Sequence, residues 1–152
     1  MKGITINCVD LEPATAAQAK EMGIFHFDLG DAPGYIATDS LGRKSWIDEK
    51  CVKLNYFLID KDNFITKEDV ERFIWKLDTG SIGQKTTIAT ATTLTGYEVT
   101  KTSACVDPKK YNIVIGKDIA YTNIINDLWD KLGFVLQWAI NGINPSKDTN
   151  KE

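Results

Sequence analysis

Histidine is nearly absent from this chain of 152 residues, and cysteine occurs at only three positions. His26 is the single histidine, and no residue beside it completes a zinc site or a Ser-His-Asp site. Cys8, Cys51 and Cys105 are odd in number, widely spaced and without a C-x-x-C pair, which favours small buried side chains over disulfides or metal ligands. The acidic residues do not show the spacing of metal ligands. We therefore expect no enzyme, no metal and no cofactor.

Arginine is also scarce, since Arg43 and Arg72 stand against sixteen lysines. The flat guanidinium group binds a phosphate with two parallel hydrogen bonds, so an anion site in this chain is expected to depend mainly on lysine and backbone N–H groups. The formal net charge is −3. A protein with this charge does not attract nucleic-acid polymers as a whole.

Long apolar runs are missing as well. No segment reaches the roughly 18 apolar residues that a membrane span needs, and the first residues contain no apolar signal core. We therefore expect a cytoplasmic protein without contact to a membrane. Hydrophobic residues make up 43% of the chain and charged residues 26%, which is the balance of an ordinary globular protein of one domain or two small ones.

The sequence predicts a first unit over residues 3–61, rich in strands and with short helices. Alternating apolar residues in GITINCVDL predict a strand that Pro13 ends. TAAQAKEM predicts a short helix with Thr15 as its N-cap. Three further elements follow along the chain: a hairpin in APGYIATDSLGRKSWI, one or two helical turns in DEKCVKLN and a strand in YFLI.

A second unit is predicted over residues 65–143, followed by a disordered tail over residues 144–152. ITKEDVERFIWKLDTG (residues 65–80) predicts a helix that begins with a capping box of Thr66 and Asp69. The threonine-rich segment 85–106 predicts two strands joined near Thr95 and Gly96. Asp107 and Pro108 then open a helix, which Gly133 divides into two. The order helix, β-hairpin, two helices makes the fold class α+β in both units.

Residues 85–140 resemble a family of small bacteriophage proteins, the Gp forty-nine-like family. The family pattern is a threonine-rich strand, T-L-x-N-G-F-E-V-x-G, then S-A-C-V-x-P and an aromatic residue, then I-G, a helix and L-W-x-L-x-G-[FY]-x-L. The chain departs from it by lacking the asparagine before Gly96 and by carrying Lys101 in place of a glycine. The matching residues are Thr93, Leu94, Gly96, Tyr97, Glu98, Val99, Ser103, Ala104, Cys105, Val106, Pro108, Tyr111, Ile115, Gly116, Ile119, Ala120, Leu128, Trp129, Leu132, Gly133, Phe134 and Leu136.

The first half is similar to a small phage accessory module, which occurs in phage proteins and sometimes beside domains that block host immunity. Its pattern is G-Y-x-V-x-Y-x-D-G-Y-x-S-W-S-P-x-x-V-F-x-x-x-Y, and the D-G-Y turn is replaced here by Leu41-Gly42-Arg43. The matching residues are Gly34, Tyr35, Gly42, Ser45, Trp46 and Tyr56.

The resemblance to the Gp forty-nine-like family implies a function, because Thoeris anti-defence one proteins are related to it. Those proteins bind and sequester cyclic nucleotide messengers of host immunity and perform no chemistry. The implied function is therefore an anti-defence protein in the host cytoplasm that sequesters a cyclic ADP-ribose isomer or a cyclic oligonucleotide. The alternative is a phage accessory protein that binds a host protein without a small ligand. A nuclease or hydrolase is disfavoured because histidine and metal clusters are missing.

The expected ligand site is the stretch from residue 97 to residue 111. The Tyr97 ring is suited to stack on a base, and the start of the next helix offers N–H groups to a phosphate. For each residue a structural role is the alternative: Tyr97 packs in the protein, Asp107 is simply an N-cap and the lysines are solvated. The residues expected to bind the ligand are Tyr97, Lys101, Thr102, Ser103, Asp107, Lys109, Lys110 and Tyr111.

The C-terminal helices carry more aromatic surface than half a chain can bury, namely Trp129, Phe134 and Trp138. An exposed tryptophan in such a place is typical of a subunit contact. The sequence therefore predicts a homo-oligomer.

Overall fold

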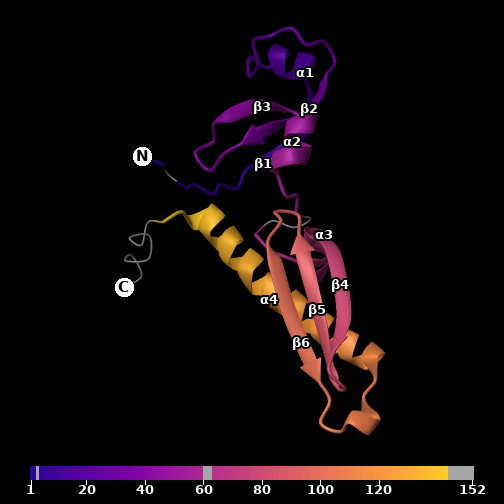
Figure 1. Cartoon of the computed structure of the whole chain (residues 1–152). Helices are drawn as coiled ribbons and strands as arrows, with labels where there is room; N and C mark the ends of the chain where they lie inside the picture. Colours follow the sequence, from indigo (N-terminus) through magenta and orange to yellow (C-terminus); the bar gives the residue numbers. More distant parts are fainter. Residues whose placement is uncertain (3, 60–62, 144–152) are drawn as a thin grey trace, which may run out of the picture. The chain divides into compact units, whose positions relative to one another are not determined.

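The computed structural model describes residues 1–2, 4–59 and 63–143 of the chain. The chain forms two compact units (Figure 1). The first unit contains Met1–Leu58 together with Leu136–Glu152, and the second contains Ile59–Val135. Each unit has its own three-stranded antiparallel sheet, so the predicted α+β class is confirmed.

The sheet of the first unit has the order β1-β2-β3, with strands β1 (Asp10–Thr15), β2 (Pro33–Thr38) and β3 (Lys44–Asp48). Helix α1 (Ala16–Glu21) follows β1 and helix α2 (Glu49–Asn55) follows β3. The Thr15 hydroxyl accepts from the Gln18 backbone N–H, and the Gln18 side chain accepts from the Thr15 N–H. The predicted N-cap of α1 is thus confirmed.

Two predicted strands of the first unit are wrong. Residues 4–9 lie in no strand, and Ile4 is 84% exposed, because β2 lies opposite the chain only from Asp10 onward. Pro13 lies inside β1, opposite Tyr35, where an edge strand tolerates a residue without an N–H. Residues 56–59 also lie in no strand, since a strand requires a partner as well as a favourable composition.

The second unit begins with helix α3 (Lys67–Phe73), followed by strands β4 (Ile74–Ile82), β5 (Thr86–Thr93) and β6 (Glu98–Ala104), in the sheet order β4-β5-β6. The predicted strands β5 and β6 and the capping box of α3 are confirmed. The helix predicted over residues 65–80 is too long. Its second half is strand β4, because aromatic and β-branched residues at 73–75 favour a strand once β5 is available for pairing.

A short 3-10 helix η1 (Pro108–Lys110) and the long helix α4 (Ile113–Asn141) complete the chain. The two predicted C-terminal helices are therefore one helix. Gly133 lies inside it, since one glycine costs a helix only about 1 kcal/mol. The predicted tail lies outside the described residues.

Small residues bring α4 close to one face of the β4–β6 sheet (Figure 1). Alternate residues of β5 are buried on this face, and Gly116 of α4 lies so close to Thr87 that a methyl group at Gly116 would overlap the threonine hydroxyl. The residues fully or nearly buried in this core include Thr87, Ala89, Ala91, Thr93, Val99, Gly116, Ala120, Ile124, Ile125, Leu128 and Leu132.

Candidate functional site

The residues predicted to bind a ligand lie at two separate places in the second unit. Tyr97 follows the turn between β5 and β6 and is 56% exposed. Residues 107–111 lie at the far end of β6. Strand β6 has seven residues, and at about 3.3 Å per residue it separates the two groups by roughly 23 Å. A single small ligand therefore does not contact both groups within one chain.

Strand β6 also divides the predicted residues that lie between these two ends. Lys101 and Ser103 pair with Ala89 and Thr87, so they lie on the face that α4 covers, whereas Thr102 lies on the opposite face. The Lys101 amine is 3.5 Å from the Asp127 carboxylate. Its charge thus already has a partner within the protein.

The predicted residues at the far end have structural roles. The Asp107 carboxylate accepts from the Lys109 backbone N–H at 3.0 Å, so its alternative role as an N-cap is confirmed. The Tyr111 hydroxyl lies 3.0 Å from the Ser81 hydroxyl and 2.8 Å from the Thr87 hydroxyl. It therefore ties the chain before α4 to the sheet. Lys109 and Lys110 are exposed.

The cysteines only partly match their predicted environment. Cys8 and Cys105 are half-buried, but Cys51 is exposed, so the prediction of three buried side chains is wrong for this residue. Within the part of the chain that the structure describes, no group of three histidine, cysteine or acidic residues is placed to hold a metal ion.

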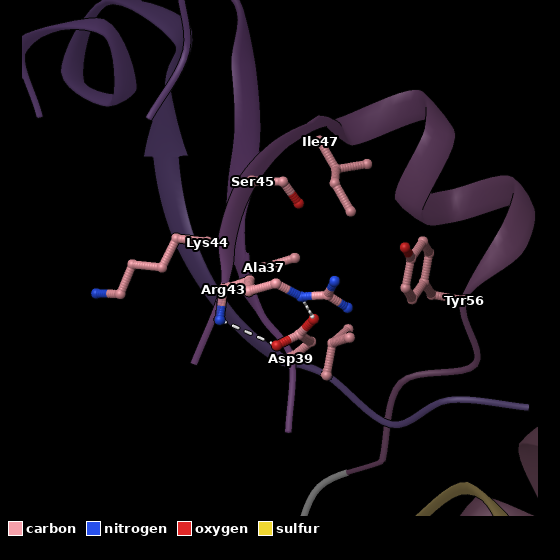
Figure 2. A pocket seen from close by; sticks show the side chains of 8 residues that line it. Ala37, Asp39, Arg43, Lys44, Ser45, Ile47 and Tyr56 are labelled. Atoms are coloured by element: carbon pink, nitrogen blue, oxygen red, sulfur yellow. Dashed lines mark hydrogen bonds and ion pairs between the residues drawn. The ribbon is translucent and has the colours of Figure 1, made fainter. Parts of the chain in front are cut away.

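A pocket of about 270 Å³ lies in the first unit, on the face of the β1–β3 sheet that Ala37 and Ile47 share (Figure 2). The end of α2 contributes Tyr56 to its wall. Figure 2 shows the Arg43 side chain extending toward Tyr56, with Lys44 pointing away. The lining residues are Val9, Ala37, Asp39, Arg43, Lys44, Ser45, Ile47 and Tyr56.

The turn between β2 and β3 places Arg43 at the rim of this pocket, where its side chain is 76% exposed. One oxygen of the Asp39 carboxylate accepts from the backbone N–H groups of Leu41 (2.9 Å) and Arg43 (3.0 Å). Its other oxygen accepts from the Arg43 Nε at 2.7 Å. Gly42 adopts a φ of 75°, which this tight turn requires and which other residues rarely adopt. The turn is therefore held by backbone contacts that do not depend on the arginine side chain.

The polar groups of the pocket have unused hydrogen-bonding capacity. Hydrogen bonds from the Arg43 backbone N–H, and then from its guanidinium group, hold the pKa of Asp39 below its usual value. Asp39 thus stays ionised and fixes the guanidinium by its Nε. Within the described residues, neither the terminal nitrogens of Arg43 nor the hydroxyls of Ser45 and Tyr56 have a hydrogen-bond partner. These groups can bind an anionic ligand that also has a flat ring.

Comparison with protein families identifies the family to which the chain belongs. The model of the Phage protein (N4 Gp49/phage Sf6 gene 66) family matches residues 49–140. The chain belongs to this family of phage proteins. The predicted resemblance over residues 85–140 is confirmed, and the match extends back to the start of α2. No curated protein and no solved structure gives a significant match.

The family match includes Tyr56 of the pocket but begins after Arg43 and Asp39. The pocket thus joins a residue of the family region to the β-hairpin that precedes it.

Across the described residues, no helix combines the length and the apolar character that crossing a bilayer demands.

Proposed function

We propose that this phage protein is a binding protein that sequesters a small nucleotide-derived messenger of host immunity and does not alter it chemically. The observation that carries the proposal is the pocket of the first unit, where Arg43 and Tyr56 face each other (Figure 2). Arg43 offers two terminal nitrogens to a phosphate, a geometry that lysine does not provide. The Tyr56 ring offers a stacking surface for a base or a ribose.

The size of the pocket limits the ligand. Pockets for drug-sized molecules have volumes of roughly 300–1,000 Å³, and this pocket measures about 270 Å³. It suits one nucleotide unit of a cyclic dinucleotide or cyclic ADP-ribose, with the rest of the messenger outside. The apolar floor of Ala37, Ile47 and Val9 favours the less polar side of a sugar or base.

Sequestration rather than catalysis fits the side chains of the pocket. Asp39 is engaged in three hydrogen bonds and keeps its charge, so it is poorly suited to take a proton from a substrate. The pocket lining contains no histidine, cysteine or lysine that points inward (Figure 2). Binding without turnover is therefore the activity that we propose.

The first test is a titration of the purified protein with cyclic ADP-ribose isomers and cyclic oligonucleotides, by calorimetry and thermal shift. A ligand that binds only the folded protein raises the free energy of unfolding by about 2.7 kcal/mol at a hundredfold excess over Kd, and this raises the melting temperature. We expect one member of this set to bind and to be recovered unchanged after denaturation of the protein. Recovery of a hydrolysed ligand would contradict the proposal.

We expect Arg43→Ala and Tyr56→Ala each to weaken binding of that ligand by about tenfold or more, since a stacked base or a bidentate phosphate contact contributes roughly 1–3 kcal/mol. Arg43→Lys should also weaken binding, because one ammonium group cannot form two parallel hydrogen bonds. Arg43→Ala should leave stability nearly unchanged, because Asp39 holds the turn through backbone N–H groups. Calorimetric titration of each variant measures these effects.

The matched control is the pair Lys109→Ala and Lys110→Ala, which removes exposed cations at the site predicted from the sequence. If the first unit holds the ligand, these variants bind like the original protein. If they lose binding and Arg43→Ala does not, the protein is still a messenger-binding protein but its site lies in the second unit.

Binding to a host protein is the second candidate function. Ile115 and Ile119 of α4 are 57% and 47% exposed and lie one helical turn apart, which is the spacing of an apolar contact on a helix face. This function predicts that Ile119→Lys abolishes activity in infected cells while no small ligand binds the protein. Normal activity of the Ile119→Lys variant would exclude binding of a host protein through this helix face.

A further inference from the structure

The β4–β6 sheet has two edges, and they differ in how they are protected. Natural sheets guard an edge with a charged residue that points inward, because an open edge pairs with other chains. On β6, Lys101 lies on the face covered by α4 and pairs with Asp127. On β4 the charged residues Lys76 and Asp78 lie on the opposite, open face. β4 therefore lacks the inward-pointing charge that protects β6.

The backbone of β4 presents free groups at alternate residues. Thr93 donates its N–H to the Tyr97 carbonyl, so the odd-numbered residues of β5 bond to β6 and the even-numbered ones to β4. Asp78 lies opposite Thr90 and Lys76 opposite Thr92, so these two residues bond to β5. The N–H and carbonyl groups of the residue between them, Leu77, point away from the sheet and are available to another strand.

The side chains along this edge are self-complementary. Lys76 and Asp78 flank Leu77 on one face and lie 2.6 Å apart as an exposed ion pair. If two copies of β4 run antiparallel with Leu77 opposite Leu77, each Lys76 lies opposite an Asp78. A two-fold axis perpendicular to the sheet keeps each face on its own side. Both charge pairs then form at once, and a register centred on the neighbouring outward-pointing residue, Thr79, loses them.

Apolar side chains along β4 also lack cover within one chain. Trp75, at the bulge where β4 begins, is 71% exposed, Leu77 is 40% exposed and Ile82 is 54% exposed. Leu77 lies on the same face of the sheet as the residues of β5 that α4 buries. A second copy paired along β4 would therefore bring the Leu77 side chains of the two copies together on this face. Such contacts stabilise an antiparallel pair beyond its backbone hydrogen bonds.

We propose that strand β4 pairs with the same strand of a second copy of this chain, antiparallel and centred on Leu77, so that the two sheets form one. Lys76 of each subunit then forms an ion pair with Asp78 of the partner subunit. This interface is independent of the ligand pocket. It also differs from the oligomer predicted from the aromatic residues of the C-terminal helix.

Charge reversal tests the register directly. Lys76→Asp gives a strand with two acidic side chains, and Asp78→Lys gives one with two basic side chains. Each variant alone places like charges opposite each other, and we expect its dimer Kd to rise at least about tenfold. An equimolar mixture of the two variants should form a heterodimer, and the double variant Lys76→Asp with Asp78→Lys should dimerise like the original protein. Light scattering and native mass spectrometry over a concentration series measure each state.

The matched control is Lys53→Asp, which reverses an exposed lysine that forms an ion pair with Glu49 in α2. Its dimer should be unchanged. The proposal is overturned if the original protein stays monomeric up to high micromolar concentration, which leaves β4 to another partner, or if the single reversals dimerise as well as the original. Circular dichroism of each variant shows whether it is folded, and the heterodimer forms only from folded chains.

Discussion

Gly116→Ala is expected to destabilise the second unit by about 2 kcal/mol, because overpacking a close contact costs roughly 1–3 kcal/mol. A Cβ at Gly116 would overlap the Thr87 hydroxyl oxygen and would lie 2.9 Å from the Thr87 Cβ. Rotating the threonine away would break its 2.8 Å contact with the Tyr111 hydroxyl and would leave the second overlap in place. Helix α4 must therefore move off the sheet, or the sheet must deform.

Gly133→Ala is the matched control in the same helix. A Cβ at Gly133 meets no heavy atom within 4 Å, so alanine brings only its better helix propensity. We expect it to stabilise the protein by about 0.5–1 kcal/mol. Urea unfolding at neutral pH measures both variants on one scale. Equal effects of the two substitutions would show that α4 does not pack on β5 at Gly116.

A double substitution links the effect to Thr87 itself. Thr87→Ala removes the hydroxyl oxygen that a methyl group at Gly116 would meet first, although it also loses the contact with Tyr111. The cost of Gly116→Ala should therefore be smaller in the Thr87→Ala protein than in the original. Such non-additivity is expected only for residues in direct contact.

Local signals account for the parts of the fold that the sequence predicts correctly. Thr15 and Thr66 predict the starts of α1 and α3, because all residues of a capping box lie within four consecutive positions. The turn at Thr95 and Gly96 is equally local, and Gly96 has the positive φ of 80° that favours glycine. None of these elements depends on a distant segment.

Strand β4 could not be predicted in this way, because its conformation is decided by β5. Val70 and Phe73 have the spacing of apolar residues on one helix face, and Leu77 continues this spacing. Pairing with β5 instead satisfies the backbone groups of alternate residues from Lys76 to Ile82, so the tertiary contact overrides the local periodicity. The one-residue bulge at Trp75 marks the point where one pattern replaces the other.

The pocket of the first unit was missed for a similar reason. Asp39 and Arg43 approach each other across a tight turn, and Tyr56 joins them only after α2 has folded back. The available signal was an acidic residue four positions before one of two arginines, with Gly42 between them. The scarcity of arginine favours lysines as the cations of an anion site, whereas a rare arginine fixed by a carboxylate is itself typical of such a site.

Asp69→Asn is expected to destabilise the protein at neutral pH by about 2–3 kcal/mol, because a buried group loses charge-assisted hydrogen bonds. Asp69 is fully buried. One of its carboxylate oxygens accepts from the Thr66 N–H (2.8 Å) and the Thr66 hydroxyl (2.7 Å), and the other accepts from the Arg72 guanidinium. Asparagine has a single carbonyl oxygen, and its NH₂ group would face a donor on either side. Asp107→Asn, at an exposed N-cap with one accepted hydrogen bond, should change stability by less than about 0.5 kcal/mol because asparagine caps equally well.

The loss at Asp69 should depend on pH in one direction only. Burial alone would raise the pKa of Asp69, but hydrogen bonds from Thr66 and Arg72 outweigh it and lower the pKa below its usual value. A carboxyl whose pKa is lower in the folded state stabilises the protein fully above its unfolded pKa of about 3.9 and loses this contribution as the pH falls through the folded pKa. The difference in unfolding free energy between the original protein and Asp69→Asn should therefore be constant from pH 7 to about pH 5 and shrink below about pH 4. Urea unfolding at each pH gives that difference, and other carboxyls cancel from it because both proteins share them. A difference that stays constant down to pH 3 would mean that folding does not lower the pKa of Asp69.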